Sequence, residues 1–266
     1  MSDILKKIVA DAQIRISHYK RETDEATLQS VAEAMPAPAN FLQAIENNDG
    51  VALIAEIKRA SPSKGMIREN FDPVSIARDY QSGGATCLSV LTEEKHFLGH
   101  LDYLTAVKSS VEIPLLRKDF IIDPYQVFQA KVCGASAVLL IAECLNDATL
   151  NQLHDLIVQI GLTPLVEFHD QKNLQRSVDC GAQLIGINNR DLRTFETDLT
   201  HCIGLSQKIP KDRTIVAESG IYTYQEVRKL EEAGINAMLV GESLMRESNL
   251  VSAVRQLLGK EDSATE

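Results

Sequence analysis

Eight short apolar runs rich in Val, Ile and Leu recur along the chain, and this repetition restricts the fold more than any other feature. They are Val51–Ile57, Cys87–Leu91, Ile113–Leu116, Ala137–Ile141, Thr163–Val166, Leu184–Ile187, Thr214–Ala217 and Ala237–Val240. Nearly continuous apolarity over so few residues is typical of strands buried on both faces, as in a parallel sheet.

Segments with helical periodicity lie between these runs, for example 147–160 and 222–233. Four Gly residues stand near the expected helix ends, each shortly before the next strand, at Gly84, Gly134, Gly181 and Gly234. Eight strands alternating with helices favour an α/β fold of the (β/α)₈ TIM barrel type. A doubly wound open sheet is the alternative, but no G-x-G-x-x-G follows the first strand.

About fifty residues precede the first strand. Ile4–Lys20 has the pattern of an amphipathic helix, Met35–Asn40 is a break with Asn40 as an N-cap, and Phe41–Glu46 begins a second short helix. We therefore expect a single barrel domain over residues 1–266, with residues 1–50 as an N-terminal helical extension. This extension would close the bottom of the barrel or reach over part of its mouth.

Charge and composition exclude several classes of partner. The net charge is −10 with no basic block, which argues against nucleic-acid binding. The N-terminus lacks the apolar stretch of a signal peptide, and the longest clean apolar run, Ala137–Ala142, is too short to cross a membrane. The five Cys residues show no C-x-x-C spacing, and no His pair has metal-ligand spacing with a carboxylate. We expect a cytoplasmic protein without a metal.

Charged and amide side chains follow the expected strands, at the barrel end where active sites lie. Glu56 and Lys58 stand two residues apart and so face the same side of their strand. Across the strands the candidate acid/base and polar groups are Glu56, Lys58, Lys118, Glu167, Asn188 and Glu218. Lysines and carboxylates converging on one rim predict general acid/base chemistry; the alternative is that one or two of them are structural ion pairs.

Small residues follow the seventh and eighth strands, as Ser219-Gly220 and Gly241-Glu242. They predict a phosphate site, because they let backbone N–H groups approach the anion. An ordinary tight turn is the alternative. The Glu242 side chain suits this site only if it turns to solvent.

Seven ordered motifs resemble those of the indole-3-glycerol-phosphate synthase family, a family of (β/α)₈ barrels in tryptophan biosynthesis. They are AEIKRASPS (55–63), SVLTEEKHF (89–97), LRKDFI (116–121), LVEFH (165–169), IGINNRDL (185–192), AESGI (217–221) and GESLMR (241–246). They span residues 50 to 250, and the chain resembles the monofunctional form. The resemblance implies a carboxy-lyase acting on 1-(2-carboxyphenylamino)-1-deoxyribulose 5-phosphate, which yields indole-3-glycerol phosphate, CO₂ and water.

By this resemblance, Lys118 is the general acid of ring closure and Glu167 the proton acceptor of the dehydration. Glu56 and Lys58 complete the ionic network, and Lys58 helps to hold the substrate carboxylate. Which lysine protonates the departing hydroxyl stays open.

The resemblance also implies the binding groups. Asn188 and Glu218 bind the ribulose hydroxyls, and Phe97 packs on the anthranilate ring. The phosphate is held by Ser61, Arg190, Ser219, Gly220 and Gly241, with only a backbone contact from Glu242. No cofactor is implied, because the substrate ring is the electron sink. We expect a monomer, with weak association left open.

Two other functions fit some of these residues. A class I aldolase would use Lys58 or Lys118 to form a Schiff base, but pairing with Glu favours a charged amine. A non-catalytic sugar-phosphate binding protein would lack turnover. A phosphosugar isomerase would need an Asp–Cys or paired-Asp arrangement, which we do not find.

Overall fold

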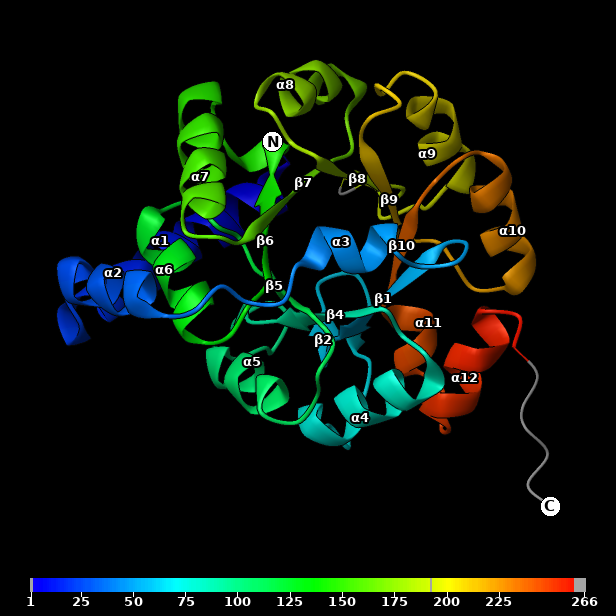
Figure 1. The fold of residues 1–266 in the computed structure, drawn as a ribbon, viewed down its shortest axis with the longest axis horizontal. Helices are drawn as coiled ribbons and strands as arrows, with labels where there is room; N and C mark the ends of the chain where they lie inside the picture. Colours follow the sequence, from blue (N-terminus) through cyan, green and yellow to red (C-terminus); the bar gives the residue numbers. More distant parts are fainter. Residues whose placement is uncertain (1, 192, 261–266) are drawn as a thin grey trace.

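Eight parallel strands close into a barrel in the computed structural model, which describes residues 2–191 and 193–260 (Figure 1). The strands are β1 (Ala52–Ile57), β4 (Cys87–Leu91), β5 (Leu115–Lys118), β6 (Ala137–Ile141), β7 (Thr163–Phe168), β8 (Leu184–Asn188), β9 (Thr214–Glu218) and β10 (Ala237–Val240). Each pairs with its neighbours in chain order, and β1 pairs with both β4 and β10. The expected (β/α)₈ barrel is confirmed, and the open sheet is excluded. Leu192, the last residue of one motif, and residues 261–266 lie outside the described residues.

Alternation along the strands decides which side chains fill the barrel. On β1, Ala52 and Ile54 belong to the inner apolar cluster, whereas Leu53 and Ala55 pack outward against the helices. The same period of two then brings Glu56 to the inside at the carboxyl end. Every residue of the eight barrel strands but two is buried, as expected for strands covered on both faces.

Four strands extend further toward their carboxyl ends than their apolar runs predict. The third was expected at 113–116 but is β5 at 115–118, so Arg117 and Lys118 belong to it. Likewise β7, β8 and β9 continue to Phe168, Asn188 and Glu218. Apolarity marks only the part of a strand inside the core, whereas backbone pairing continues to the polar rim.

Helices form the outer ring (Figure 1). They are α4 (Pro73–Gly83), α5 (Leu101–Lys108), α6 (Pro124–Val132), α7 (Asp147–Gln159), α8 (Leu174–Asp179), α9 (Leu199–Ser206), α10 (Tyr224–Glu232), α11 (Glu242–Met245) and α12 (Leu250–Leu257), with short 3₁₀ turns η1 (Ala142–Cys144) and η2 (Gln171–Asn173). Two-residue strands β2 (Ala60–Ser61) and β3 (Gly65–Met66) form a hairpin after β1. Gly84 is the C-cap of α4, as the Gly near this expected helix end predicted. Its φ of 103° lies in the left-handed region, which favours Gly.

The N-terminal extension covers both ends of the barrel. It consists of α1 (Asp3–Glu22), α2 (Glu25–Ala34) and α3 (Phe41–Glu46). At the start of β9, Thr214 donates a 3.4 Å hydrogen bond to Glu46 of α3, so α3 closes the bottom. Arg15 of α1 is 2.6 Å from Asp119, just after β5, so α1 lies at the mouth.

Asn40 caps α3 as predicted. Helix α2 was not anticipated from the sequence. Within the described residues, no helix is both long and apolar enough to cross a membrane.

Candidate active site

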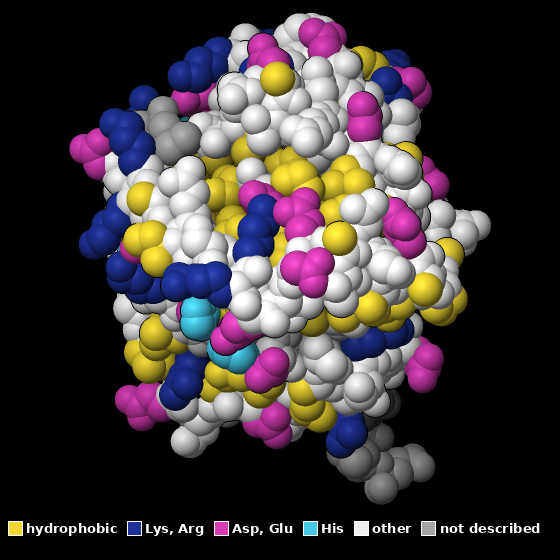
Figure 2. Space-filling model, turned by 90° about the vertical axis from the view of Figure 1, so that its left-hand side faces the viewer, with side chains coloured by type: hydrophobic (Ala, Val, Ile, Leu, Met, Phe, Trp, Pro, Cys, Tyr) yellow, Lys and Arg dark blue, Asp and Glu magenta, His cyan; other side chains and the backbone are white. Residues whose placement is uncertain are grey.

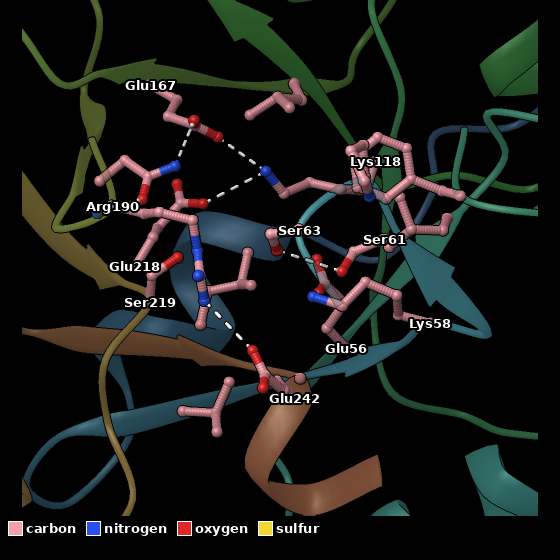
Figure 3. Close-up of a pocket in the computed structure, with 18 of the residues that line it drawn as sticks. Glu56, Lys58, Ser61, Ser63, Lys118, Glu167, Arg190, Glu218, Ser219 and Glu242 are labelled. Carbon is pink, nitrogen blue, oxygen red and sulfur yellow. Dashed lines mark hydrogen bonds and ion pairs between the residues drawn. The ribbon is translucent and has the colours of Figure 1, made fainter. Parts of the chain in front are cut away.

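A pocket opens at the carboxyl ends of the strands, and every residue predicted for the site lines it (Figure 3). These residues are Glu56, Lys58, Ser61, Phe97, Lys118, Glu167, Asn188, Arg190, Glu218, Ser219, Gly220, Gly241 and Glu242. They come from six strands or the loops that follow them, together with the loop after β4. The barrel brings them together because parallel strands all end at the same rim.

Lys118 lies at the centre of an ionic cluster. Its Nζ is 2.7 Å from Glu167 Oε2 and 3.3 Å from Glu218 Oε2. Burial alone would lower the pKa of Lys118, but the charges of Glu167, Glu218 and Glu56 outweigh it, so this pKa is raised. Lys118 is therefore an ammonium group at neutral pH.

The two carboxyl groups beside Lys118 are held in opposite protonation states. Burial opposes ionisation of Glu167, but Lys118 outweighs it, helped by a 2.8 Å hydrogen bond from Asn188 Nδ2, so the pKa of Glu167 is lowered. Burial and the charge of Glu167 raise the pKa of Glu218 to about 8. The site thus holds one carboxylate and one carboxylic acid near neutral pH.

Glu218 also has unused hydrogen-bonding capacity. Its Oε1 is buried and has no partner among the residues that the structure describes. A Cβ at Gly186 would lie 2.4 Å from this oxygen, so any other residue there would force the Glu218 carboxyl group to move. Gly186 was not predicted for the site, although its place two residues before Asn188, at an inward-facing strand position, was the available signal.

Glu56 and Lys58 form a second ion pair on the opposite wall. Their side chains are largely buried, with exposures of 5% and 16%. A Cβ at Gly241 would lie 2.4 Å from Glu56 Oε1. Gly241 therefore makes room for this carboxylate, a role distinct from the predicted phosphate contact.

Arg190 reaches into the pocket from the loop after β8. Its Nη1 donates to the carbonyl oxygen of Phe195 at 3.2 Å, and its Nη2 lies 3.2 Å from Glu242 Oε2. The Glu242 side chain thus remains inside the pocket, only 13% exposed, and does not turn to solvent as the phosphate prediction required. The attraction of nearby cations explains this orientation.

The loop after β9 has an unusual backbone. Ser219 and Gly220 have φ values of 66° and 75°, and a left-handed conformation is unfavourable for Ser. The buried amide of Asn189 holds this turn by donating to the Ser219 carbonyl oxygen at 3.0 Å. On the other side of the pocket, Ser61 and Ser63 lie 3.4 Å apart through their hydroxyl oxygens.

Apolar side chains form the rest of the wall. The rings of Phe97 and Phe120 are 6.2 Å apart, and Ile4, Leu5 and Ile8 of α1 also line the pocket. Figure 2 shows one face of the molecule with acidic and basic side chains gathered in a hollow among hydrophobic ones. Phe120 and the α1 residues were not predicted for the site. The amphipathic period of α1 was visible, but not where its apolar face would lie.

Other charged groups near the rim have structural partners. Glu93 accepts hydrogen bonds from the backbone N–H groups of residues 95, 96 and 97, which fixes the loop that carries Phe97. His96 contacts Asp11 of α1 at 2.8 Å, and His169 contacts the carbonyl oxygen of Asn188 at 2.8 Å. Neither His is among the residues lining the pocket.

Comparisons with known proteins agree with this geometry. A family model described as indole-3-glycerol phosphate synthase matches residues 5–257. The indole-3-glycerol phosphate synthase of Rhodopirellula baltica is 49% identical, over 96% of this chain and 98% of its own. That of Lachnoclostridium phytofermentans is 43% identical, over 96% and 98%.

Solved structures give the fold alone. A 3-hexulose-6-phosphate synthase superposes with a TM-score of 0.65 at 14% identity, covering 79% of this chain and 99% of its own. With the family model over nearly the whole chain and such close relatives, the chain belongs to the indole-3-glycerol phosphate synthase family.

Proposed function

We propose that this enzyme closes the indole ring of 1-(2-carboxyphenylamino)-1-deoxyribulose 5-phosphate, with loss of CO₂ and water, and that the Lys118 cluster performs the proton transfers. The observation that carries this assignment is the largely buried ammonium group of Lys118 between Glu167 and Glu218, beside an apolar wall. The reaction needs a fixed positive charge, a base and an apolar surface for an aromatic ring within one pocket.

In the first step, Lys118 acts on the ketone oxygen. Attack by the aromatic ring develops negative charge on this oxygen, and a nearby ammonium stabilises that charge and supplies the proton. The raised pKa of Lys118 supports this role because it keeps the group charged before the substrate reacts. Decarboxylation then follows near the apolar wall, where a carboxylate is poorly solvated.

In the dehydration, Glu167 accepts the proton whose loss restores aromaticity, while the hydroxyl departs as water with a proton from Lys118 or Lys58. The lowered pKa of Glu167 supports this role because the group is ionised and ready to accept a proton. Asn188 and Lys118 each hold one of its oxygens, which fixes its orientation. Glu218, with its pKa near 8, is suited to donate a hydrogen bond to a ribulose hydroxyl.

The remaining groups bind the substrate. Lys58, which forms an ion pair with Glu56, binds the substrate carboxylate. Phe97 and Phe120 flank the anthranilate ring, and Ile4, Leu5 and Ile8 extend this surface. The phosphate binds to Arg190, with Ser61, Ser219, Gly220, Gly241 and the backbone of Glu242 around it.

The main competing function is a Schiff-base aldolase. Imine formation needs a neutral amine, and the carboxyl groups around Lys118 favour the charged form. Borohydride reduction in the presence of substrate should therefore give no covalent adduct at Lys118. A stable adduct detected by mass spectrometry would favour the aldolase.

The decisive assay for the proposed function is indole fluorescence after the purified protein is mixed with the substrate in the presence of EDTA. We expect the indole signal to rise. Binding of the substrate without any fluorescence change would instead support a non-catalytic sugar-phosphate binding protein.

We further propose that the barrel and its N-terminal extension work as one domain in a cytoplasmic monomer. The ion pair between Arg15 and Asp119 supports a single unit, because it joins α1 to the barrel mouth. A molar mass near 29.3 kDa in light scattering would agree with a monomer. A mass of twice that value would rule it out.

A further inference from the structure

The Glu242 carboxylate lies where three cationic side chains converge. Its Oε2 is 3.2 Å from Arg190 Nη2, while its Oε1 is 3.3 Å from Arg246 Nη2 and 3.6 Å from Lys64 Nζ. The proposed mechanism uses the backbone of Glu242 but gives its side chain no task. Figure 3 shows this carboxylate directed at Arg190 across the pocket.

Arg190 does not depend on Glu242 for its position. Its Nη1 is anchored by the Phe195 carbonyl oxygen at 3.2 Å, and its backbone N–H donates to Asn188 Oδ1 at 2.9 Å. Glu242 therefore occupies a donor of Arg190 that could otherwise bind an anion. A carboxylate in this position competes with a phosphate group for the same guanidinium.

The charges around Glu242 also fit this competition. Lys64, Arg190 and Arg246 supply three positive charges, and Glu242 cancels one of them. Two positive charges then remain for a phosphate monoester, which carries between about 1.5 and 2 negative charges at neutral pH. Without the carboxylate, the same cations would hold the phosphate more tightly.

We propose that the Glu242 side chain is a built-in counter-ion of Arg190 that the substrate phosphate displaces, so that Glu242 limits the affinity of the site for phosphorylated ligands. This inference rests on the proposed function, which assigns the phosphate to Arg190. The displaced carboxylate keeps a partner, because Arg246 and Lys64 are about half exposed at the pocket edge and flank its other oxygen. The lower affinity for the phosphate favours release of the product, which carries the same phosphate as the substrate.

The test compares ligands with and without the phosphate. Dissociation constants for indole-3-glycerol phosphate and for its dephosphorylated form are measured by calorimetry with the wild type, Glu242→Gln and Glu247→Gln. Glu247 is an exposed acid five residues further on and serves as the matched control for the lost charge. Glu242→Gln should bind the phosphorylated ligand about five- to tenfold more tightly, as expected for removing one like charge at a partly screened distance.

Glu247→Gln should change the dissociation constant of either ligand less than about twofold, because exposed single charges contribute little. Glu242→Gln should likewise change the dissociation constant of the dephosphorylated ligand less than about twofold. Glu242→Asp, whose shorter side chain withdraws the carboxylate from Arg190, should give an intermediate tightening. Unchanged or weaker binding of the phosphorylated ligand by Glu242→Gln would overturn the inference, as would equal tightening of both ligands. If the wild type did not turn over substrate, the proposed function itself would fail, whatever the Glu242 variants showed.

Discussion

Three neighbouring charged residues at the carboxyl end of β5 belong to two networks that differ in how completely their polar groups are paired. Lys118 faces the pocket, whereas Arg117 and Asp119, on either side of it, join a second network, although Asp119 also lines the pocket. Alternation along the strand separates Arg117 from Lys118, since successive side chains point to opposite faces. Both networks are largely buried and ionic, so neither burial nor charge distinguishes the network that we propose for catalysis from the other one.

The Arg117 network is saturated with partners inside the protein. Arg117 Nη1 donates to the Gln126 carbonyl oxygen at 2.7 Å and its Nε to Thr92 Oγ1 at 3.2 Å. Asp119 accepts from Arg15 at 2.6 Å, from Thr92 at 2.6 Å and from the backbone of Phe120 at 2.8 Å. These bonds join β4, β5, α6 and α1, and they leave Asp119 little capacity for a ligand.

The Lys118 network keeps unused capacity and is open to the pocket. Glu218 Oε1 has no partner within the described part of the chain, and the raised pKa of Glu218 provides a proton that can be shared. A buried polar atom without a partner is costly to stability unless a ligand satisfies it. The difference between the two networks is thus incomplete pairing at the pocket surface, which supports our proposal that the Lys118 network binds the substrate.

The largest effect is expected for Lys118→Ala. Turnover should fall by about 10³-fold or more, because the variant loses both the proton donor and the charge that stabilises the developing oxyanion. Steady-state rates from indole fluorescence would measure this, with circular dichroism to verify that the variant is folded. Lys95→Ala is the control, since this lysine is largely exposed and pairs with Asp11 away from the pocket. A folded Lys118→Ala enzyme with near-normal turnover would contradict the assignment.

Asp119→Ala should mainly reduce stability, whereas Lys118→Ala should mainly reduce turnover. Removing Asp119 leaves Arg15 and Arg117 without their shared carboxylate, which should lower the free energy of unfolding by about 3–5 kcal/mol. Urea denaturation would measure the loss. Turnover per folded molecule should fall far less than in Lys118→Ala. An unchanged unfolding free energy, or a loss of turnover as large as that of Lys118→Ala, would remove the distinction between the two networks.

Much of this contrast follows from the sequence, because strand periodicity already places Lys118 and Glu167 on the inside. The ion pair between Glu56 and Lys58 could be predicted from their spacing of two residues alone. Nothing local, however, distinguishes Asp119 from Glu218, since both are acids at the end of a strand motif. Their difference depends on Arg15, more than a hundred residues away from Asp119 in the chain.

Neither the direction of the Glu242 side chain nor the position of α1 could be predicted from the sequence. The side chain of Glu242 is directed by cations from three separate segments, at Lys64, Arg190 and Arg246. The apolar face of α1 was evident, but amphipathicity gives no direction in space, and both ends of the barrel offer an apolar surface. Such features depend on long-range contacts, which single-chain patterns do not encode.

Arg190→Ala tests the phosphate side of the pocket and should have a smaller effect. The Michaelis constant should rise by about 10- to 100-fold, the range for losing a charge-assisted hydrogen bond, with kcat changed much less. The phosphate is bound in both the ground state and the transition state, which explains this pattern. Steady-state kinetics would measure it, with Arg193→Ala, an exposed arginine in the same loop, as the control. An unchanged Michaelis constant would move the phosphate site elsewhere.

The smallest effect at neutral pH is expected for Glu218→Gln, and it tests the shared proton directly. Because the pKa of Glu218 is raised to about 8, the wild type has this group protonated at pH 7 and loses the proton as the pH rises through 8. The protonated group is the one that donates a hydrogen bond, so kcat/KM should fall above pH 8 in the wild type. Gln resembles the protonated acid in shape and neutrality, so the variant should lose less than about tenfold at pH 7 and should not show that fall. Glu218 would not hold the proton if kcat/KM of the wild type did not change across pH 8, or if the variant still lost kcat/KM above pH 8. The incomplete pairing around Lys118 would then need another explanation.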